Sequence, residues 1–117
     1  MVLTLRGGAS ITATVTKASV EALELEPGKE AYALVKASAV ILGTELHALR
    51  TSARNLLCGT VIQIIDGPVN AEVTVDLGEG NSISAVITHE SASDLGLSLG
   101  AHACALFKAS SVIVGVV

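Results

Sequence analysis

The sequence predicts an all-β protein made of two related modules in tandem. Three observations support this prediction. Residues 77–115 repeat much of residues 5–43, apolar and polar side chains alternate along several short stretches, and glycine-rich turns separate these stretches. A repeat of this length indicates duplication of one structural unit, and alternation with a period of two is typical of a half-buried strand.

The repeat has a fixed offset. Aligning Ile11 with Ile83 sets it at 83 − 11 = 72 positions, and roughly half of the residues from Leu5 to Gly43 then match their counterparts. Many matches are apolar residues or glycines that any shared fold needs. The polar matches are different, because a core does not require them, and they are therefore the candidate functional residues: Thr16 with Thr88, Ser19 with Ser91, Lys36 with Lys108 and Ser38 with Ser110.

The elements of the first copy follow in order from these patterns. A strand is expected at 10–16, where Ile11, Ala13 and Val15 alternate with polar residues after a glycine turn. One or two helical turns are expected at 19–25, which begin with a serine and end before Pro27-Gly28. Two further strands are expected at 31–36 and 39–43.

The second copy adds strands at its start. Strands are expected at 59–65, 69–77, 82–88, 101–108 and 111–115, with a helical turn at 91–97. A full module therefore has about five short strands and one short helix. This count predicts a small antiparallel β-barrel of the OB type, an architecture that limits exposed strand edges.

The module boundary is expected in the short connector at 44–50. We therefore divide the chain into an incomplete first module, residues 1–46, and a complete second module, residues 47–117. The first module begins near the position that matches Thr74 and would leave apolar surface open, so a partner chain or a rearranged strand pairing is expected to complete it. Half of the residues are apolar and only 15% are charged, which favours an oligomer.

Composition excludes several partners. The net charge is −4 with no basic stripe, so nucleic acid is not expected. No apolar run reaches the ~18 residues of a membrane span, and the N-terminal residues lack the pattern of a secretion signal, so no membrane contact and a cytoplasmic location are expected. Cys58 and Cys104 have no recognisable spacing. We expect buried free thiols, in preference to a metal site or a disulfide.

No enzymatic activity is expected. The three histidines, His47, His89 and His102, stand at unrepeated positions and are interpreted as surface residues. Paired acids are absent from the repeated positions, and the glycines belong to hairpins instead of a phosphate-binding loop.

The repeat conserves hydrogen-bond donors. Lysine and serine recur in Lys36-Ala37-Ser38 and Lys108-Ala109-Ser110, where the backbone amides of the turn are free of a strand ladder. Such a set suits an anion. The alternative is that the lysines are solvated strand ends and that the threonine and serine only cap the helical turn.

The donor set contains no carboxylate. A dianion without a proton needs only donors, whereas a partly protonated phosphate also benefits from an acceptor. The set therefore favours an ion like molybdate, tungstate or sulfate over phosphate. Each charge-assisted hydrogen bond contributes ~1.5–3 kcal/mol, so loss of Arg54 or Lys108 should weaken binding roughly ten- to a hundredfold.

Several motifs in order carry a family resemblance. Thr51-Ser52-Ala53-Arg54-Asn55, Gly67-Pro68-Val69-Asn70-Ala71-Glu72-Val73, Ile87-Thr88 and Lys108-Ala109-Ser110 resemble the Mop family of small molybdate-binding proteins, the molbindins. The resemblance implies OB-like modules that assemble into trimers or hexamers and hold molybdate at subunit interfaces, for molybdenum storage and homeostasis. The same module also serves as the molybdate-sensing part of a transcription regulator.

The resemblance also implies site residues. Ser52 and Arg54 would face the donors of a neighbouring module, with molybdate or tungstate as the ligand and no organic cofactor. Those donors are Thr88, Ser91, Lys108, Ala109 and Ser110, or their counterparts Thr16, Ser19, Lys36, Ala37 and Ser38. A second type of site would involve Val69 and Asn70. Two alternatives stay open: the sensing domain of a regulator, and a structural oligomerisation module that binds no ligand.

Overall fold

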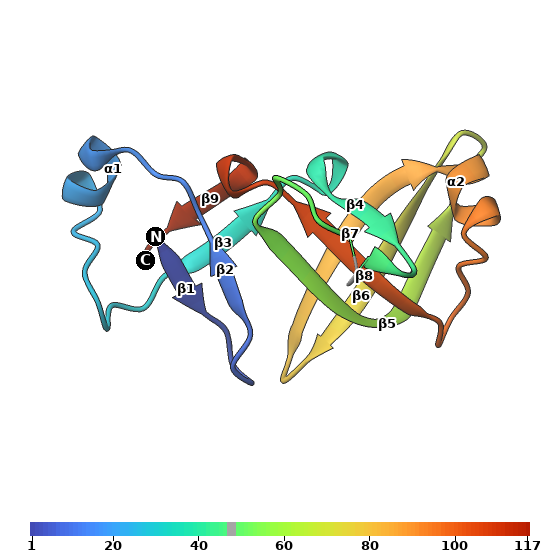
Figure 1. Cartoon of the computed structure of the whole chain (residues 1–117), viewed down its shortest axis with the longest axis horizontal. Coiled ribbons are helices and arrows are strands. Elements are labelled where there is room, and N and C mark those ends of the chain that lie inside the picture. The colour runs from blue at the N-terminus through green and yellow to red at the C-terminus, as the bar shows by residue number, and fades with distance from the viewer. Residues whose placement is uncertain (47–48) are drawn as a thin grey trace.

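The computed structural model describes residues 1–46 and 49–117 and consists mainly of antiparallel strands (Figure 1). The strands of the first half are β1 (Val2–Thr4), β2 (Ser10–Thr12), β3 (Tyr32–Val35) and β4 (Ile41–Gly43). Those of the second half are β5 (Asn55–Asp66), β6 (Asn70–Gly78), β7 (Asn81–Thr88), β8 (His102–Phe107) and β9 (Val112–Gly115). Short helices α1 (Lys17–Ala22) and α2 (His89–Asp94) and the 3-10 turns η1 (Ala37–Ala39) and η3 (Ala109–Ser111) connect them.

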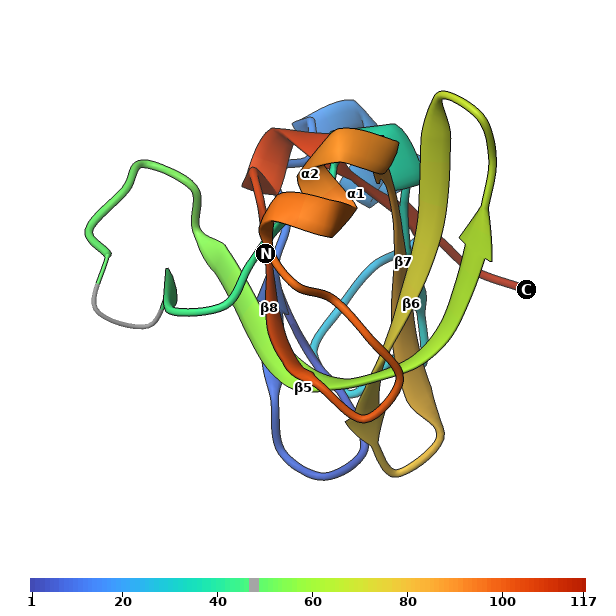
Figure 2. The same cartoon turned by 90° about the vertical axis from the view of Figure 1, so that its right-hand side faces the viewer.

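The largest sheet has the order β4-β8-β5-β6-β7 and curls strongly (Figure 2). Its inner face follows the period of two, because alternate residues such as Val73, Val75, Ala103 and Ala105 are fully buried. This core consists mainly of valine and alanine side chains, together with Leu42. The prediction of an all-β, OB-like fold with about five strands and a short helix per full module is confirmed.

The two halves exchange their last strands. β4 of the first half pairs with β8 of the second, and β9 of the second half pairs with β3 of the first. The two registers are equivalent under the repeat, since Gly43 pairs with Cys104 and Gly115 with Tyr32. The sequence alignment assigned each last strand to its own module. In the structure each last strand instead pairs with a strand of the other half, so the β3–β4 and β8–β9 connections cross between the halves.

A second core joins the halves. Ile11 and Ala13 from β2 and its extension pack with Leu57, Phe107 and Val112 from the second half. Asn55, a polar residue beside this core, is only 2% exposed and bonds to the backbone of Thr12. The connection between the halves is therefore a packed interface as well as a strand exchange.

The helices begin earlier than predicted. α2 starts at His89, and its N-cap is Thr88, whose hydroxyl oxygen accepts the Ser91 N–H at 3.0 Å. Ser91 therefore lies within the first turn, whereas the sequence predicted that the helix begins at Ser91. The threonine has extended backbone angles, which is the conformation of an N-cap residue. Thr16 caps α1 in the same way.

The cysteine prediction is wrong. Cys58 is exposed, and it forms a disulfide with the buried Cys104, which lies directly opposite it on the neighbouring strand. The two cysteines are 46 positions apart in sequence, so only strand pairing reveals that they are adjacent.

The histidine predictions have separate outcomes. His89 and His102 are exposed, as predicted, while His47 lies outside the described residues. No helix in the described part of the chain is long and apolar enough to cross a membrane.

Candidate oxyanion-binding site

The candidate donors gather along one side of the molecule. α1, α2 and the two 3-10 turns lie on the upper side in both views, whereas the β1–β2 and β6–β7 hairpin turns lie on the lower side (Figures 1 and 2). The repeated polar residues belong to these helices and turns. The fold therefore places both copies of the donor set on the same side of the protein.

Each Lys-Ala-Ser turn bridges the two halves. η1 connects β3, in the first half, to β4, in the sheet of the second half, and η3 connects β8 to β9 in the reverse direction. The Ser111 N–H bonds to the Lys108 carbonyl at 2.9 Å, and the Ala39 N–H bonds to the Lys36 carbonyl at 2.8 Å. The amides of Ala109 and Ser110 precede the first bond of their turn, so they can donate to a ligand. The same holds for Ala37 and Ser38.

We use the name first donor cluster for the predicted set Ser52, Arg54, Thr16, Ser19 and Lys108-Ala109-Ser110. Three contacts of the backbone bring its segments together. The Thr14 N–H bonds to the Ala109 carbonyl at 3.0 Å, Asn55 bonds to Thr12, and Asn55 pairs with Phe107 in the β5–β8 register. Arg54 therefore directly precedes Asn55, which is fixed to both β2 and β8. The residue that Asn55 pairs with on β8, Phe107, directly precedes Lys108.

The second donor cluster comprises Lys36-Ala37-Ser38, Thr88, Ser91 and Asn70. Ser38, Asn70, Thr88 and Ser91 line one shallow pocket together with apolar residues from β4 and β7. Asn70 lies opposite Thr88 in the β6–β7 register, and the Val69 carbonyl accepts the His89 N–H at 2.8 Å. The segment proposed for a second type of site is thus adjacent to the repeated donors.

Strand exchange decides which donors meet. The structure places Ser38 of the first half beside Thr88 and Ser91 of the second, and Ala109 of the second half beside the segment that leads to Thr16. Ser110, the counterpart of Ser38 in the second half, does not line the pocket that contains Thr88 and Ser91. The sequence therefore predicts the candidate donors, but the Lys-Ala-Ser donors of each copy lie next to segments of the other copy.

The hydroxyl pairs serve both as caps and as donors. Thr88 donates its proton to Ser91 Oγ at 2.7 Å while accepting the Ser91 N–H. Thr16 and Ser19 repeat this arrangement at 2.9 Å. A serine hydroxyl that accepts one bond keeps its own proton to donate, so each serine can bind an anion without giving up the cap. Capping and ligand binding are therefore compatible.

The cations of the clusters carry no acidic partner. Within residues 1–46 and 49–117 the recorded ion pair joins His89 to Asp66 at 2.9 Å, and Arg54, Lys36 and Lys108 are exposed. One carboxylate, Asp94, lines the second cluster's pocket. Its counterpart in the repeat is Ala22, so the first cluster is the purer donor set.

A curled antiparallel sheet whose connecting turns carry repeated donors, with cations that form no ion pair within the described residues, has the arrangement of an anion-binding module. The TOBE domain family matches the chain over residues 2–42 and 51–114. The chain belongs to the TOBE domain family and, within it, to the Mop-type proteins, the molbindins. The resemblance stated from the sequence motifs is confirmed.

Individual relatives are similar over nearly the whole chain. The molybdenum transport protein ModE of Azotobacter vinelandii is 55% identical over 106 residues, which cover 91% of this chain and 39% of that protein. The molybdenum-pterin-binding protein MopA of Rhodobacter capsulatus is 51% identical over 112 residues, covering 96% and 42%. The chain thus spans about two fifths of the length of these curated relatives.

A solved structure shares the fold. The cytoplasmic molybdate-binding protein ModG, in a form with molybdate bound, superposes with a TM-score of 0.94 at 47% identity. The superposition covers 99% of this chain and 82% of that one. The strand exchange therefore occurs within an architecture that is also known from a crystal structure.

Proposed function

We propose that this chain is a cytoplasmic molybdate- or tungstate-binding protein that stores or buffers the oxyanion and has no catalytic activity. The observation that carries the proposal is that strand pairing and hydrogen bonds hold the segment before Thr16, the residue after Arg54 and the Lys108 turn together. We infer that their hydroxyls, turn amides and cations face one anion. The molybdate-bound relative ModG supports the choice of ligand. The absence of an acceptor disfavours phosphate, which carries a proton at neutral pH. The smaller size of sulfate distinguishes it from molybdate and tungstate.

Titration calorimetry tests this function. We expect heat on titration with molybdate and tungstate, and much weaker binding of sulfate and phosphate under the same conditions. Phosphate binding as strong as molybdate binding would contradict the proposal, and so would the absence of heat with all four ions.

Arg54→Ala should weaken molybdate binding about ten- to a hundredfold, because the guanidinium supplies charge-assisted hydrogen bonds worth ~1.5–3 kcal/mol. Arg6→Ala is a matched control. It removes the same charge from an exposed turn of the β1–β2 hairpin, on the opposite side of the molecule, and should leave the dissociation constant unchanged. Equal effects of the two substitutions would mean that Arg54 acts only through the net charge of the protein and does not contact the anion.

Binding is proposed to occur in a homo-oligomer, a trimer or hexamer. Exposed apolar side chains recur at equivalent places in the exchanged strands: Ile41 on β4 is 60% exposed and Ile113 on β9 is 61% exposed. Leu34, opposite Ile113, is 59% exposed. Apolar side chains clustered on a protein surface commonly mark an interface.

We therefore expect light scattering to show an oligomer, and Ile113→Glu to lower its mass, because the added charge would have to be desolvated in the contact. Glu21→Gln, on the exposed face of α1, is the comparison variant and should retain the wild-type mass. A monomeric wild-type protein would refute interface binding.

A further inference from the structure

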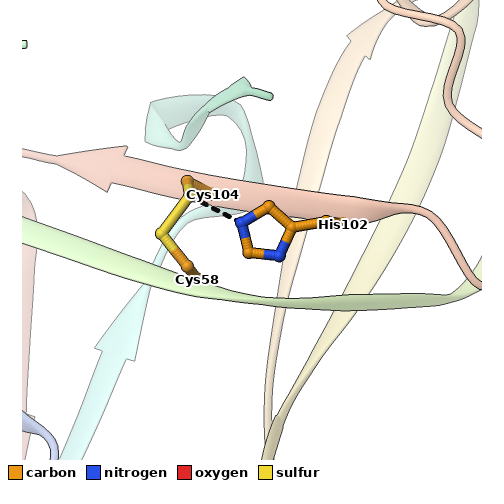
Figure 3. Close-up of side chains that lie close together, drawn as sticks. All are labelled: Cys58, His102 and Cys104. Carbon is orange, nitrogen blue, oxygen red and sulfur yellow. Dashed lines mark hydrogen bonds between the residues drawn. A yellow bond between two sulfur atoms is a disulfide. The ribbon is translucent and has the colours of Figure 1, made fainter. Parts of the chain in front are cut away.

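A group of potential metal ligands lies outside both donor clusters. Cys58 on β5 and Cys104 on β8 are directly opposite each other, and His102 precedes Cys104 by two residues (Figure 3). Residues two apart on a strand share a face, so the three side chains project together. Their neighbours Ala103 and Ala105 point into the core. The group therefore lies on the outer face of the β5–β8 pair.

The spacing of the Cys104 sulfur and the His102 nitrogen suits two ligands of a small tetrahedral metal site. The Cys104 sulfur and the His102 Nε2 are 3.6 Å apart, and the ligand atoms of all three residues lie within 4.8 Å of one another. Zinc binds thiolate at about 2.3 Å and imidazole at about 2.0–2.1 Å in tetrahedral geometry. Those lengths put a sulfur and a nitrogen ligand about 3.5 Å apart, close to the observed separation.

Access to the group differs between its members. Cys58 and His102 are exposed, whereas Cys104 is fully buried, and its other strand neighbour is Gly43. An incoming thiol can therefore reach Cys58 from solvent, and so can a metal ion. Cys104 is held in place by strands on both sides, which favours a fixed ligand position once the disulfide is opened.

We propose that Cys58, His102 and Cys104 form a redox-gated zinc site, closed by the disulfide and opened by reduction. The site offers two thiolates and one imidazole, and it leaves the fourth zinc position to water, as in open zinc sites. The location supports the reduced form, because the cytoplasm proposed above keeps thiols reduced. The site itself does not depend on oxyanion binding.

The gating step is thiol–disulfide exchange with a cellular dithiol. The thiolate of the dithiol attacks the Cys58 sulfur, the Cys58–Cys104 bond breaks, and Cys104 leaves as a thiolate. The second thiol of the reductant then displaces Cys58, so the reductant becomes a disulfide and the protein gains two thiols. Zinc binding to the two thiols releases two protons.

This site is separate from the repeated donors. Cys104 matches Tyr32 in the first copy and His102 matches Glu30, so the repeat does not duplicate the ligands. One zinc ion per chain is therefore expected, irrespective of how many oxyanions bind.

Anaerobic titration with zinc against a chromophoric chelator tests the proposal on the full chain. The dithiol-reduced protein should bind one zinc ion per chain, and the oxidised protein should bind at least about a hundredfold more weakly because its thiolates are absent. Cobalt(II) provides a second readout, since thiolate charge-transfer bands should appear only with reduced protein. Equal zinc uptake before and after reduction, or no uptake after it, would overturn the proposal.

Two exposed variants separate the ligands from unspecific binding. His102→Gln should weaken zinc binding of the reduced chain by at least about tenfold, because changes even beyond the ligands of a zinc site cost about that much. His89→Gln removes an exposed histidine outside the group and should have no effect. Cys58→Ser should abolish the cobalt thiolate bands seen with the wild type or reduce them strongly. Unchanged zinc affinity in His102→Gln would remove the histidine from the site.

Discussion

Asn55→Ala is expected to lower the free energy of unfolding by about 2–6 kcal/mol. The Asn55 Oδ1 accepts the Thr12 N–H at 2.7 Å, and its Nδ2 donates to the Thr12 carbonyl at 2.8 Å. Both bonds join segments 43 positions apart, beside the core that connects the halves. Alanine would leave both backbone groups without their partner, at a cost of about 1–3 kcal/mol each where they stay buried.

Urea denaturation followed by circular dichroism measures this loss. Asn81→Ala is the matched control, because the Asn81 Nδ2 donates one exposed bond to the Arg6 carbonyl at 3.0 Å. That variant should lose less than about 1 kcal/mol. Asn55→Asp replaces the donating Nδ2 with a carboxylate oxygen that faces the Thr12 carbonyl in a buried position, so it should cost at least as much as Asn55→Ala at a pH where the carboxylate is charged. Similar losses in Asn55→Ala and Asn81→Ala would contradict the assigned role.

The same asparagine positions the first donor cluster. It follows Arg54 directly and pairs with Phe107, which precedes Lys108. Under conditions where Asn55→Ala remains folded, its molybdate affinity should also fall, because the arginine would no longer be held against β2 and the turn at Lys108. The stability and binding effects share one cause.

Gly59→Ala is expected to cost about 3 kcal/mol or to prevent folding. A β-carbon at this position would stand only 2.0 Å from the Asp76 carbonyl oxygen and 3.2 Å from Val75 Cγ1. The first of these atoms belongs to the backbone of β6, which pairs with β5, so it cannot move without separating the strands. Overpacking of a rigid site typically costs about 1–3 kcal/mol, and occasionally more.

Thermal unfolding should show this loss as a clearly lower midpoint. Gly115→Ala is the control within a strand, since a β-carbon there meets nothing within 4 Å. That substitution should be neutral or slightly stabilising, because alanine has less backbone freedom to lose on folding. An unaltered midpoint in Gly59→Ala would mean that β5 and β6 are less closely paired than the structure shows.

Local patterns predicted most elements of the fold. The alternation around Val73 and Val75 predicted β6, and Lys108-Ala109-Ser110 was correctly predicted as a turn between two strands. The internal repeat predicted the candidate donors, because Thr88 and Lys108 recur where no core requires them. Such features depend on neighbours in sequence, so a sequence alone contains them.

The helix start and the cysteines show where local reasoning failed. Thr88 caps α2 because its extended backbone directs its hydroxyl at the Ser91 amide, and this geometry moved the helix start by two residues relative to prediction. Cys58 and Cys104 meet because β5 pairs with β8 in one particular register. Their sequence spacing contains no trace of that register.

By itself, the sequence predicted most of the strands and turns, although not β1 or the first four residues of β5, and it singled out a repeated set of candidate hydrogen-bond donors. Only the tertiary structure decided that β4 and β9 exchange places, and hence that Ser38 meets Thr88 and Ser91 of the other copy. The reason is physical: side-chain alternation is set by adjacent residues, whereas the choice of a strand's partner depends on hydrogen bonds and packing between distant segments.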